Sequence, residues 1–69
     1  MGALKFNHGD LVTIQINYFK TDTNAVRTGS IGIIREPAKD SFGSNLVEVF
    51  GSDDNWYLRN NEMDLLHRA

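Results

Sequence analysis

The side chains able to perform acid–base or metal chemistry are few in this chain of 69 residues. Its two histidines, His8 and His67, are not spaced as a metal-binding pair. Zinc requires three or four converging nitrogen, sulfur or carboxylate ligands, and the chain has no cysteine. We therefore interpret both histidines as surface residues and expect neither a metal nor another cofactor.

The adjacent carboxylates Asp53 and Asp54 are the next candidates, because paired carboxylates can serve in acid–base catalysis or in calcium binding. They belong to the run Gly-Ser-Asp-Asp-Asn, and aspartate and asparagine side chains readily bond to turn backbone. A calcium loop would need more oxygen ligands at regular spacing. The chain also lacks a nucleophile elbow and a glycine-rich phosphate loop. We therefore predict a turn here and no enzymatic activity.

Length and composition restrict the classes of fold and function that remain. A chain this short forms one domain with a modest core, because it buries only about 60% of the surface of its unfolded form. Seven basic residues against nine acidic ones give a net charge of -2, which does not favour binding to a phosphate backbone. The first residues show neither a signal peptide nor a membrane span, and the lack of cysteine suits a reducing compartment. We expect a cytoplasmic protein.

Residues 46–59 form the best-defined local pattern, in which Leu-Val-Glu-Val-Phe and Trp-Tyr-Leu-Arg flank the turn-forming run. This arrangement predicts an antiparallel hairpin. Neighbouring strand residues point to opposite faces, so at most one of Trp56 and Tyr57 is in the core. We predict that Trp56 shares the inward face of Leu58 and that Tyr57 is outward; the reverse register would expose the tryptophan.

The rest of the chain predicts short strands that pair with this hairpin. Residues 1–8 form an N-terminal arm, with Leu4 and Phe6 alternating with polar positions, and residues 9–69 form the domain. Further strands are expected over 11–16, 29–35 and 64–67, with a hairpin-like loop over 17–28, a loop over 38–45 and one helical turn over 60–63. Proline at position 37 ends the second of these strands because it has no amide hydrogen. The expected inward residues are Val12, Ile14, Ile16, Ile31, Ile33, Val47, Val49, Trp56, Leu58 and Met63.

This order of elements resembles the SH3-like barrel, a five-stranded, strongly bent antiparallel sheet folded over one core, and the resemblance covers Gly9 to Leu66. The chain is similar to bacterial and plastid members that open Gly-Asp-x-Val-x-Ile, continue with Gly-x-Ile and a Val-x-Val-x-Phe-like strand, and close Glu-(Leu/Met)-x-Leu. The matching residues are Gly9, Asp10, Val12, Ile14, Gly29, Ile31, Glu62, Met63 and Leu65. Small accessory subunits of photosystem I and of the plant-type NAD(P)H dehydrogenase complex carry such a pattern, as do KOW-type modules. These motifs describe how a small barrel is built, so the resemblance implies an all-β fold with a single-turn helix before the last strand and implies no function.

The chain has more apolar residues than one face of such a sheet can bury. The apolar residues at the alternate positions, which point to the other face of the sheet, are Leu11, Ile34, Leu46, Phe50 and Tyr57. The N-terminal arm or the loops could cover them. The alternative is an outward apolar face that contacts a partner, because contiguous exposed apolar groups commonly mark an interface. We predict that this face mediates self-association or docking on a larger protein.

The leading hypothesis is therefore a non-enzymatic protein–protein interaction module, such as an accessory or regulatory subunit, and the brevity of the chain suggests a phage or other mobile element as its source. The predicted partner-binding residues are Tyr18, Phe19, Ile34, Phe50, Tyr57 and Arg59, with Lys20, Arg27 and Arg35 helping to orient the partner. Recognition of polyproline peptides is not expected, since the acidic loop and the exposed tryptophan of proline-binding barrels are not clearly present. The alternative is nucleic-acid binding, as in KOW-type and chromatin-type barrels, with arginines on phosphates and an aromatic ring on a base. A third hypothesis, an enzyme whose site forms only in an oligomer, has no candidate residues.

Overall fold

The computed structural model describes residues 5–19, 25–40 and 42–69, and nearly all of its regular structure is strand. The strands are β1 (Leu11–Ile14), β2 (Tyr18–Phe19), β3 (Ala25–Val26), β4 (Ile31–Glu36), β5 (Ser44–Val49), β6 (Asn55–Arg59) and β7 (Met63–His67). The 3-10 turn η1 (Asn60–Glu62) separates β6 from β7 and is the only helical element among these residues. The predicted all-β class and the helical turn before the last strand are therefore confirmed.

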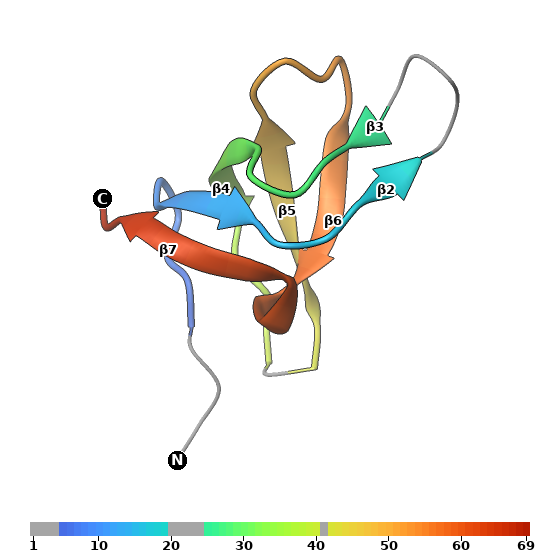
Figure 1. The fold of residues 1–69 in the computed structure, drawn as a ribbon. Helices are drawn as coiled ribbons and strands as arrows, with labels where there is room; N and C mark the ends of the chain where they lie inside the picture. The colour runs from blue at the N-terminus through green and yellow to red at the C-terminus, as the bar shows by residue number, and fades with distance from the viewer. Residues whose placement is uncertain (1–4, 20–24, 41) are drawn as a thin grey trace.

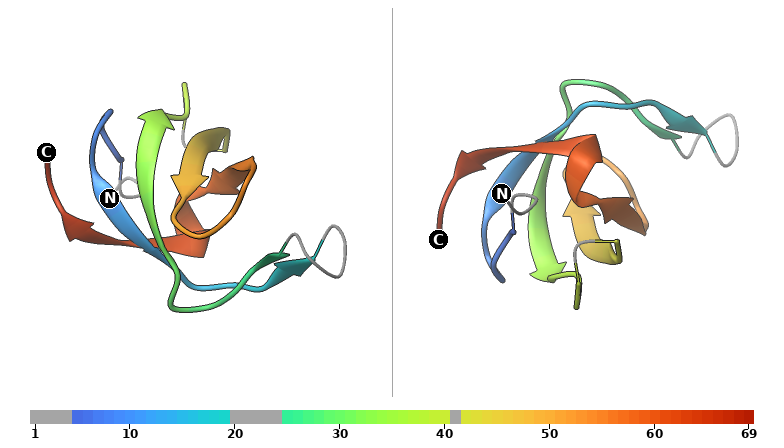
Figure 2. Two further views of the ribbon diagram at one scale, coloured as in Figure 1. Left: turned by 90° about the horizontal axis from the view of Figure 1, so that it is seen from above. Right: turned by 90° about the horizontal axis from the view of Figure 1, so that it is seen from below.

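The main sheet has five antiparallel strands in the order β6-β5-β4-β1-β7 (Figure 1). The strands β2 and β3 pair with each other in a separate two-stranded sheet, as expected from the predicted hairpin-like loop over 17–28. The two views in Figure 2 show the five strands curling around a common interior, while the β2–β3 hairpin extends to one side of them. Since the sheet does not close, β6 and β7 form its two edges.

The β5–β6 hairpin has the register predicted from the sequence. Val47 pairs with Trp56 and Leu46 pairs with Tyr57, so Trp56 is buried in the core and Tyr57 is outward. Gly51 turns the chain between the strands with a φ of 88°, a left-handed value that favours glycine. The hairpin thus directs one of its two adjacent aromatic rings into the core and the other into solvent.

One apolar core lies inside the curled sheet. Its buried members are Phe6, Val12, Ile14, Val26, Ile34, Val47, Val49, Trp56, Leu58 and Met63. Ile16 is only partly buried and packs against this core. Phe6 brings the N-terminal arm into contact with the same core, while Leu4 lies outside the described residues. The expected inward positions Val12 and Ile14 on β1, and those on the hairpin, are confirmed, whereas Ile16 lies beyond the end of β1.

Strand β4 turns the opposite face to the core from the one predicted. Ile34 was expected outward but is fully buried, whereas Ile31 and Ile33, expected inward, are exposed and half-buried. Gly32 explains the difference, because a Cβ on this inward-facing residue would lie 2.7 Å from Cγ1 of Val47. The core has no room for a side chain at position 32, so the glycine takes an inward position and the isoleucines beside it point out.

Two buried polar side chains connect the main sheet to segments outside it. Asn45 accepts a hydrogen bond from the amide of Ala38 and donates to the carbonyl of Leu58 and to Oδ1 of Asn60. Asp10 accepts hydrogen bonds from the amides of Asn7 and Ala69. In the described part of the chain, every buried side-chain polar atom has a partner.

Candidate functional site

The rings of Tyr18 and Trp56 bring the β2–β3 hairpin against strand β6. They are nearly parallel, with an interplanar angle of 9° and centroids 6.4 Å apart. The Tyr18 hydroxyl also donates a hydrogen bond of 2.7 Å to Oε2 of Glu62 in η1. At the base of the hairpin, the amide of Thr28 donates to Oδ1 of Asn17. These contacts fix where β2 presents its aromatic residues.

A hollow of about 340 Å³ lies between β2 and β6, which we call the aromatic hollow. Its lining residues are Tyr18, Phe19, Asn55, Trp56 and Tyr57. The exposed fractions are 39% for Tyr18, 63% for Phe19 and 71% for Tyr57. Trp56 is buried, and its Nε1 donates to Oγ of Ser52. The volume of the aromatic hollow is in the range of protein ligand pockets, and its rings offer a large contact area with few polar groups.

Charged groups hold two of these rings in place. The guanidinium of Arg27 lies over the ring of Phe19, 5.6 Å from its centroid. The hydrogen bond to Glu62 raises the pKa of the Tyr18 hydroxyl, and burial and the Glu62 charge act in the same direction, while Arg59 opposes them. The Tyr18 hydroxyl therefore remains the protonated donor of this hydrogen bond to a higher pH than an ordinary tyrosine hydroxyl would.

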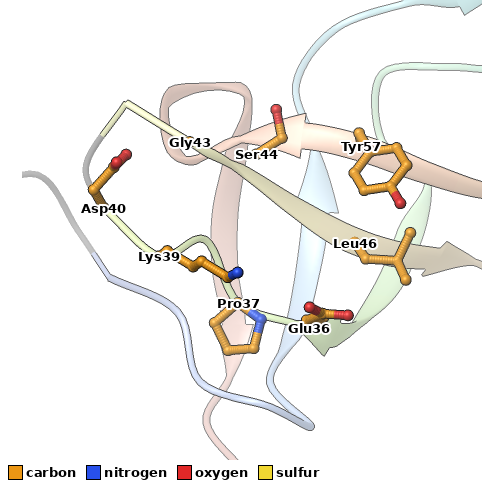
Figure 3. A pocket seen from close by; sticks show the side chains of 8 residues that line it. All are labelled: Glu36, Pro37, Lys39, Asp40, Gly43, Ser44, Leu46 and Tyr57. Carbon is orange, nitrogen blue, oxygen red and sulfur yellow. The ribbon is translucent and has the colours of Figure 1, made fainter.

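A second hollow of about 300 Å³, the loop hollow, lies on the outer side of β5 and β6 (Figure 3). Its lining residues are Glu36, Pro37, Lys39, Asp40, Gly43, Ser44, Leu46 and Tyr57. Four of these belong to the β4–β5 connection, which the Asn45 hydrogen bond to Ala38 holds near β5. Tyr57 lines both hollows, so its exposed ring stands between them.

The structure brings together three of the six predicted partner-binding residues, Tyr18, Phe19 and Tyr57. Phe50 is 53% exposed in the β5–β6 turn but does not line either hollow. Arg59 is exposed at the end of β6 and pairs across the sheet with Ser44. Ile34 is wrong as a partner-binding residue, because it is buried in the core. Lys20, predicted to orient a partner, lies outside the described residues.

Sequence reasoning missed two residues of the aromatic hollow and one further exposed aromatic residue. Trp56 was assigned to the core alone, yet it also lines the aromatic hollow with Asn55. Phe42 was read as part of a loop, and its ring is 87% exposed. An aromatic residue within a polar, glycine-containing loop is the signal that could have identified Phe42, because such a loop offers little to bury it.

Among residues 5–19, 25–40 and 42–69, no three histidine, cysteine or acidic side chains form a group that could hold a metal ion. Within the same residues, no helix has the length and apolar character needed to cross a bilayer. Comparisons with protein-family models, with curated proteins and with solved structures find no match.

Proposed function

We propose that this chain is a non-enzymatic protein-interaction module that binds its partner through the aromatic hollow. The main supporting observation is that exposed rings from two segments far apart in sequence converge around one hollow. These rings belong to Tyr18, Phe19 and Tyr57. Exposed aromatic rings dominate the energetics of protein interfaces because each buries a large apolar area when a partner covers it. Stacking and hydrogen bonding hold Tyr18 in position before a partner arrives, which limits the entropy lost on binding.

The architecture that we propose for this module is an SH3-like barrel. The strand order β6-β5-β4-β1-β7, the long β1–β4 connection that contains β2 and β3, and the turn η1 before β7 support it. The fold would supply a rigid sheet from which the connections present the binding residues.

A protein partner is favoured over nucleic acid because three of the four arginines, Arg27, Arg35 and Arg68, have partners within the chain. Arg35 forms an ion pair of 2.6 Å with Glu48, and Arg68 lies 3.4 Å from Asp10. Arg27 covers the Phe19 ring. A phosphate backbone would have to compete with these contacts and with a net charge of -2.

The proposal is tested by selecting binders from a displayed library of random peptides with the purified chain as bait. Wild-type protein is expected to enrich a family of related peptides. Phe19→Ser removes a ring from the aromatic hollow and is expected to weaken binding of the enriched peptides about tenfold or more, as loss of a central aromatic contact does. The matched control is Phe50→Ser, which removes an exposed ring that lines neither hollow and should leave the affinity unchanged.

Failure to enrich any peptide family would contradict the proposal, and so would enriched peptides that bind Phe19→Ser as well as wild type. Retention on heparin at low salt separates the nucleic-acid alternative. A phosphate-binding protein would elute at a position that moves steeply with salt. We expect this chain to pass through.

A further inference from the structure

Strand β6 is an edge of the main sheet, so one side of its backbone has no neighbouring strand in that sheet (Figure 1). In an antiparallel pair, successive residues direct their N–H and C=O groups alternately toward the partner strand and away from it. The amide of Arg59 donates to Oε1 of Glu62 and not to β5, so it points away from β5. Asn55 and Tyr57 occupy the alternate positions of the same strand, and their amides and carbonyls therefore also point outward.

The hydrogen bonds of β5 lead to the same assignment. The amide of Phe50 donates to the carbonyl of Ile31 and thus faces β4. By alternation, the main chain of Val47 faces β6, where its partner is Trp56. Trp56 therefore bonds to β5 through its main chain, and the next residue, Tyr57, faces outward. Among the described residues, the outward amide and carbonyl of Tyr57 have no hydrogen-bond partner.

The two edges of the sheet differ in how they are protected. Strand β7 is irregular, because its register with β1 shifts between Leu11 and Val12 and leaves Leu66 without a counterpart. Bulges of this kind twist an edge and discourage pairing with another strand. Strand β6 has an uninterrupted register from Asn55 to Arg59 and contains no proline. Of the two edges, β6 is therefore the one that can accept a further strand.

The aromatic hollow lies along this open edge. Asn55, Trp56 and Tyr57 line it from β6, and Tyr18 and Phe19 line it from β2. Successive strand residues point to opposite faces of a sheet, so a hollow lined by three successive residues of β6 follows the edge of the strand. A strand paired with β6 would lie about 5 Å from it, with its side chains beside the rings from β2.

We propose that the partner at the aromatic hollow is an extended peptide segment that adds to β6 as a further strand. This inference rests on the proposed function, since it names the class of partner that the same hollow binds. The main chain of an extended peptide offers N–H and C=O groups, whose partial charges are complementary to those of the outward carbonyl and amide of Tyr57. In strand addition, main-chain hydrogen bonds supply affinity, and pockets for alternate side chains supply specificity. The hollow of about 340 Å³ takes one of these side chains, and its rings favour an apolar one.

The hollow fits a single strand better than the edge of a second folded copy. It is bordered by β6 on one side and by β2 on the other, so its occupant lies between two parts of this chain. A second copy that paired through its own β6 would bring its β5 toward the position of β2, whereas a peptide brings no further strand. Pairing is limited to Asn55 and Tyr57, because Glu62 already occupies the amide of Arg59. For so short a pairing, we expect a dissociation constant on the order of micromolar.

The probe that tests the inference is the tightest-binding peptide from the display selection, synthesised with a single backbone N-methyl group at each position in turn. An N-methyl group removes one amide donor and leaves the side chain unchanged. Only every second amide of an added strand faces β6, so methylation should weaken binding about tenfold or more at alternate positions and little at those between them. Losses without this alternation, or no loss at any position, would overturn the inference.

Amide hydrogen exchange of the unmodified protein gives a second readout. In the free protein, the amide of Tyr57 should exchange faster than those of Trp56 and Leu58, which face β5. Saturation with the peptide should slow exchange at Tyr57 about tenfold or more. Unchanged exchange at Tyr57 in the saturated complex would overturn the inference. Slowing that appears when the protein is concentrated without peptide would assign the edge to a second copy, which also overturns it.

A pair of variants isolates the amide of Tyr57 from its ring. Tyr57→Ala removes the ring and keeps the amide, whereas Tyr57→Pro removes both and, at an outward edge position, breaks no bond to β5. Tyr57→Pro should bind the peptide about tenfold more weakly than Tyr57→Ala, and circular dichroism verifies that both are folded. Equal affinities of the two folded variants would overturn the inference, and amide exchange decides if the proline variant does not fold.

Failure of this inference is distinguishable from failure of the proposed function. Enriched peptides that lose affinity for Phe19→Ser but show no alternation on methylation would leave the hollow as the binding site and remove strand addition alone. A selection that enriches no peptide would remove both.

Discussion

Asp10 Oδ1 accepts a hydrogen bond of 2.9 Å from the backbone amide of Ala69, which joins two segments that lie 59 positions apart. Its other oxygen accepts the amide of Asn7 at 2.8 Å and lies 3.4 Å from the guanidinium of Arg68. Burial raises the pKa of the Asp10 carboxyl, but the two amides and the nearby positive charge outweigh it, so the pKa lies below its ordinary value. One buried carboxylate therefore holds the end of β7 against the N-terminal arm.

The chain should lose stability in acid because of this carboxylate. A pKa that is lower in the folded state than in the unfolded state stabilises the fold above the unfolded value, near 3.8. This contribution disappears as the pH falls through the lower folded pKa. Asp10→Asn keeps an acceptor but has no charge to titrate, so its unfolding free energy should change less between about pH 5 and pH 2. Thermal unfolding across this range measures the difference, and Asp64→Asn, at an exposed position on β7, serves as the control.

The orientation of β4 gives a prediction that separates two neighbouring isoleucines. Ile34→Ala should lower the free energy of unfolding by about 2–5 kcal/mol, because it removes fully buried methyl groups and leaves a cavity. Ile31→Ala should cost less than about 1 kcal/mol, since that side chain is 39% exposed on the outer face. Chemical denaturation measures both variants. Equal losses, or a larger loss at Ile31, would restore the orientation predicted from the sequence.

The sequence predicted most of the backbone because its local patterns agree with the fold. Alternation in β1 and β5 identified Val12, Ile14, Val47 and Val49 as inward residues, and all four are buried. The turn-forming run at 51–55 determined the β5–β6 hairpin. In such segments, the residue types that favour strands are also those that pack, so local and tertiary preferences coincide.

The errors arose where a contact between distant residues decides the outcome. Alternation alone could not show that Val47 occupies the space beside Gly32, and this contact reverses the faces of β4. The same limit applies to the candidate site. The aromatic residues of β2 and β6 were identified from their types, but their convergence depends on the Tyr18–Trp56 stack, which joins segments far apart in sequence.

The buried side chain of Asn45 should be essential to the β4–β5 connection. Asn45→Ala leaves the amide of Ala38 and the carbonyl of Leu58 without this partner, and each buried unsatisfied group costs about 1–3 kcal/mol. We expect a loss of about 2–4 kcal/mol in unfolding free energy, measured by urea denaturation. Asn61→Ala, at an exposed position in η1, should change it by less than about 0.5 kcal/mol. Similar losses at the two positions would show that the buried network contributes little.

The hydroxyl of Tyr18 should titrate above the ordinary tyrosine pKa of 10.0, because it donates a hydrogen bond to Glu62 and ionisation would break this bond. Tyr57→Phe removes the other tyrosine of the chain, so ultraviolet absorbance then reports Tyr18 alone. Adding Glu62→Gln removes the negative charge near the hydroxyl and should lower the titration midpoint toward 10.0. Adding Glu48→Gln instead, which removes a carboxylate paired with Arg35, should leave the midpoint in place. A midpoint that Glu62→Gln does not lower would contradict the contact between β2 and η1 that positions the aromatic hollow.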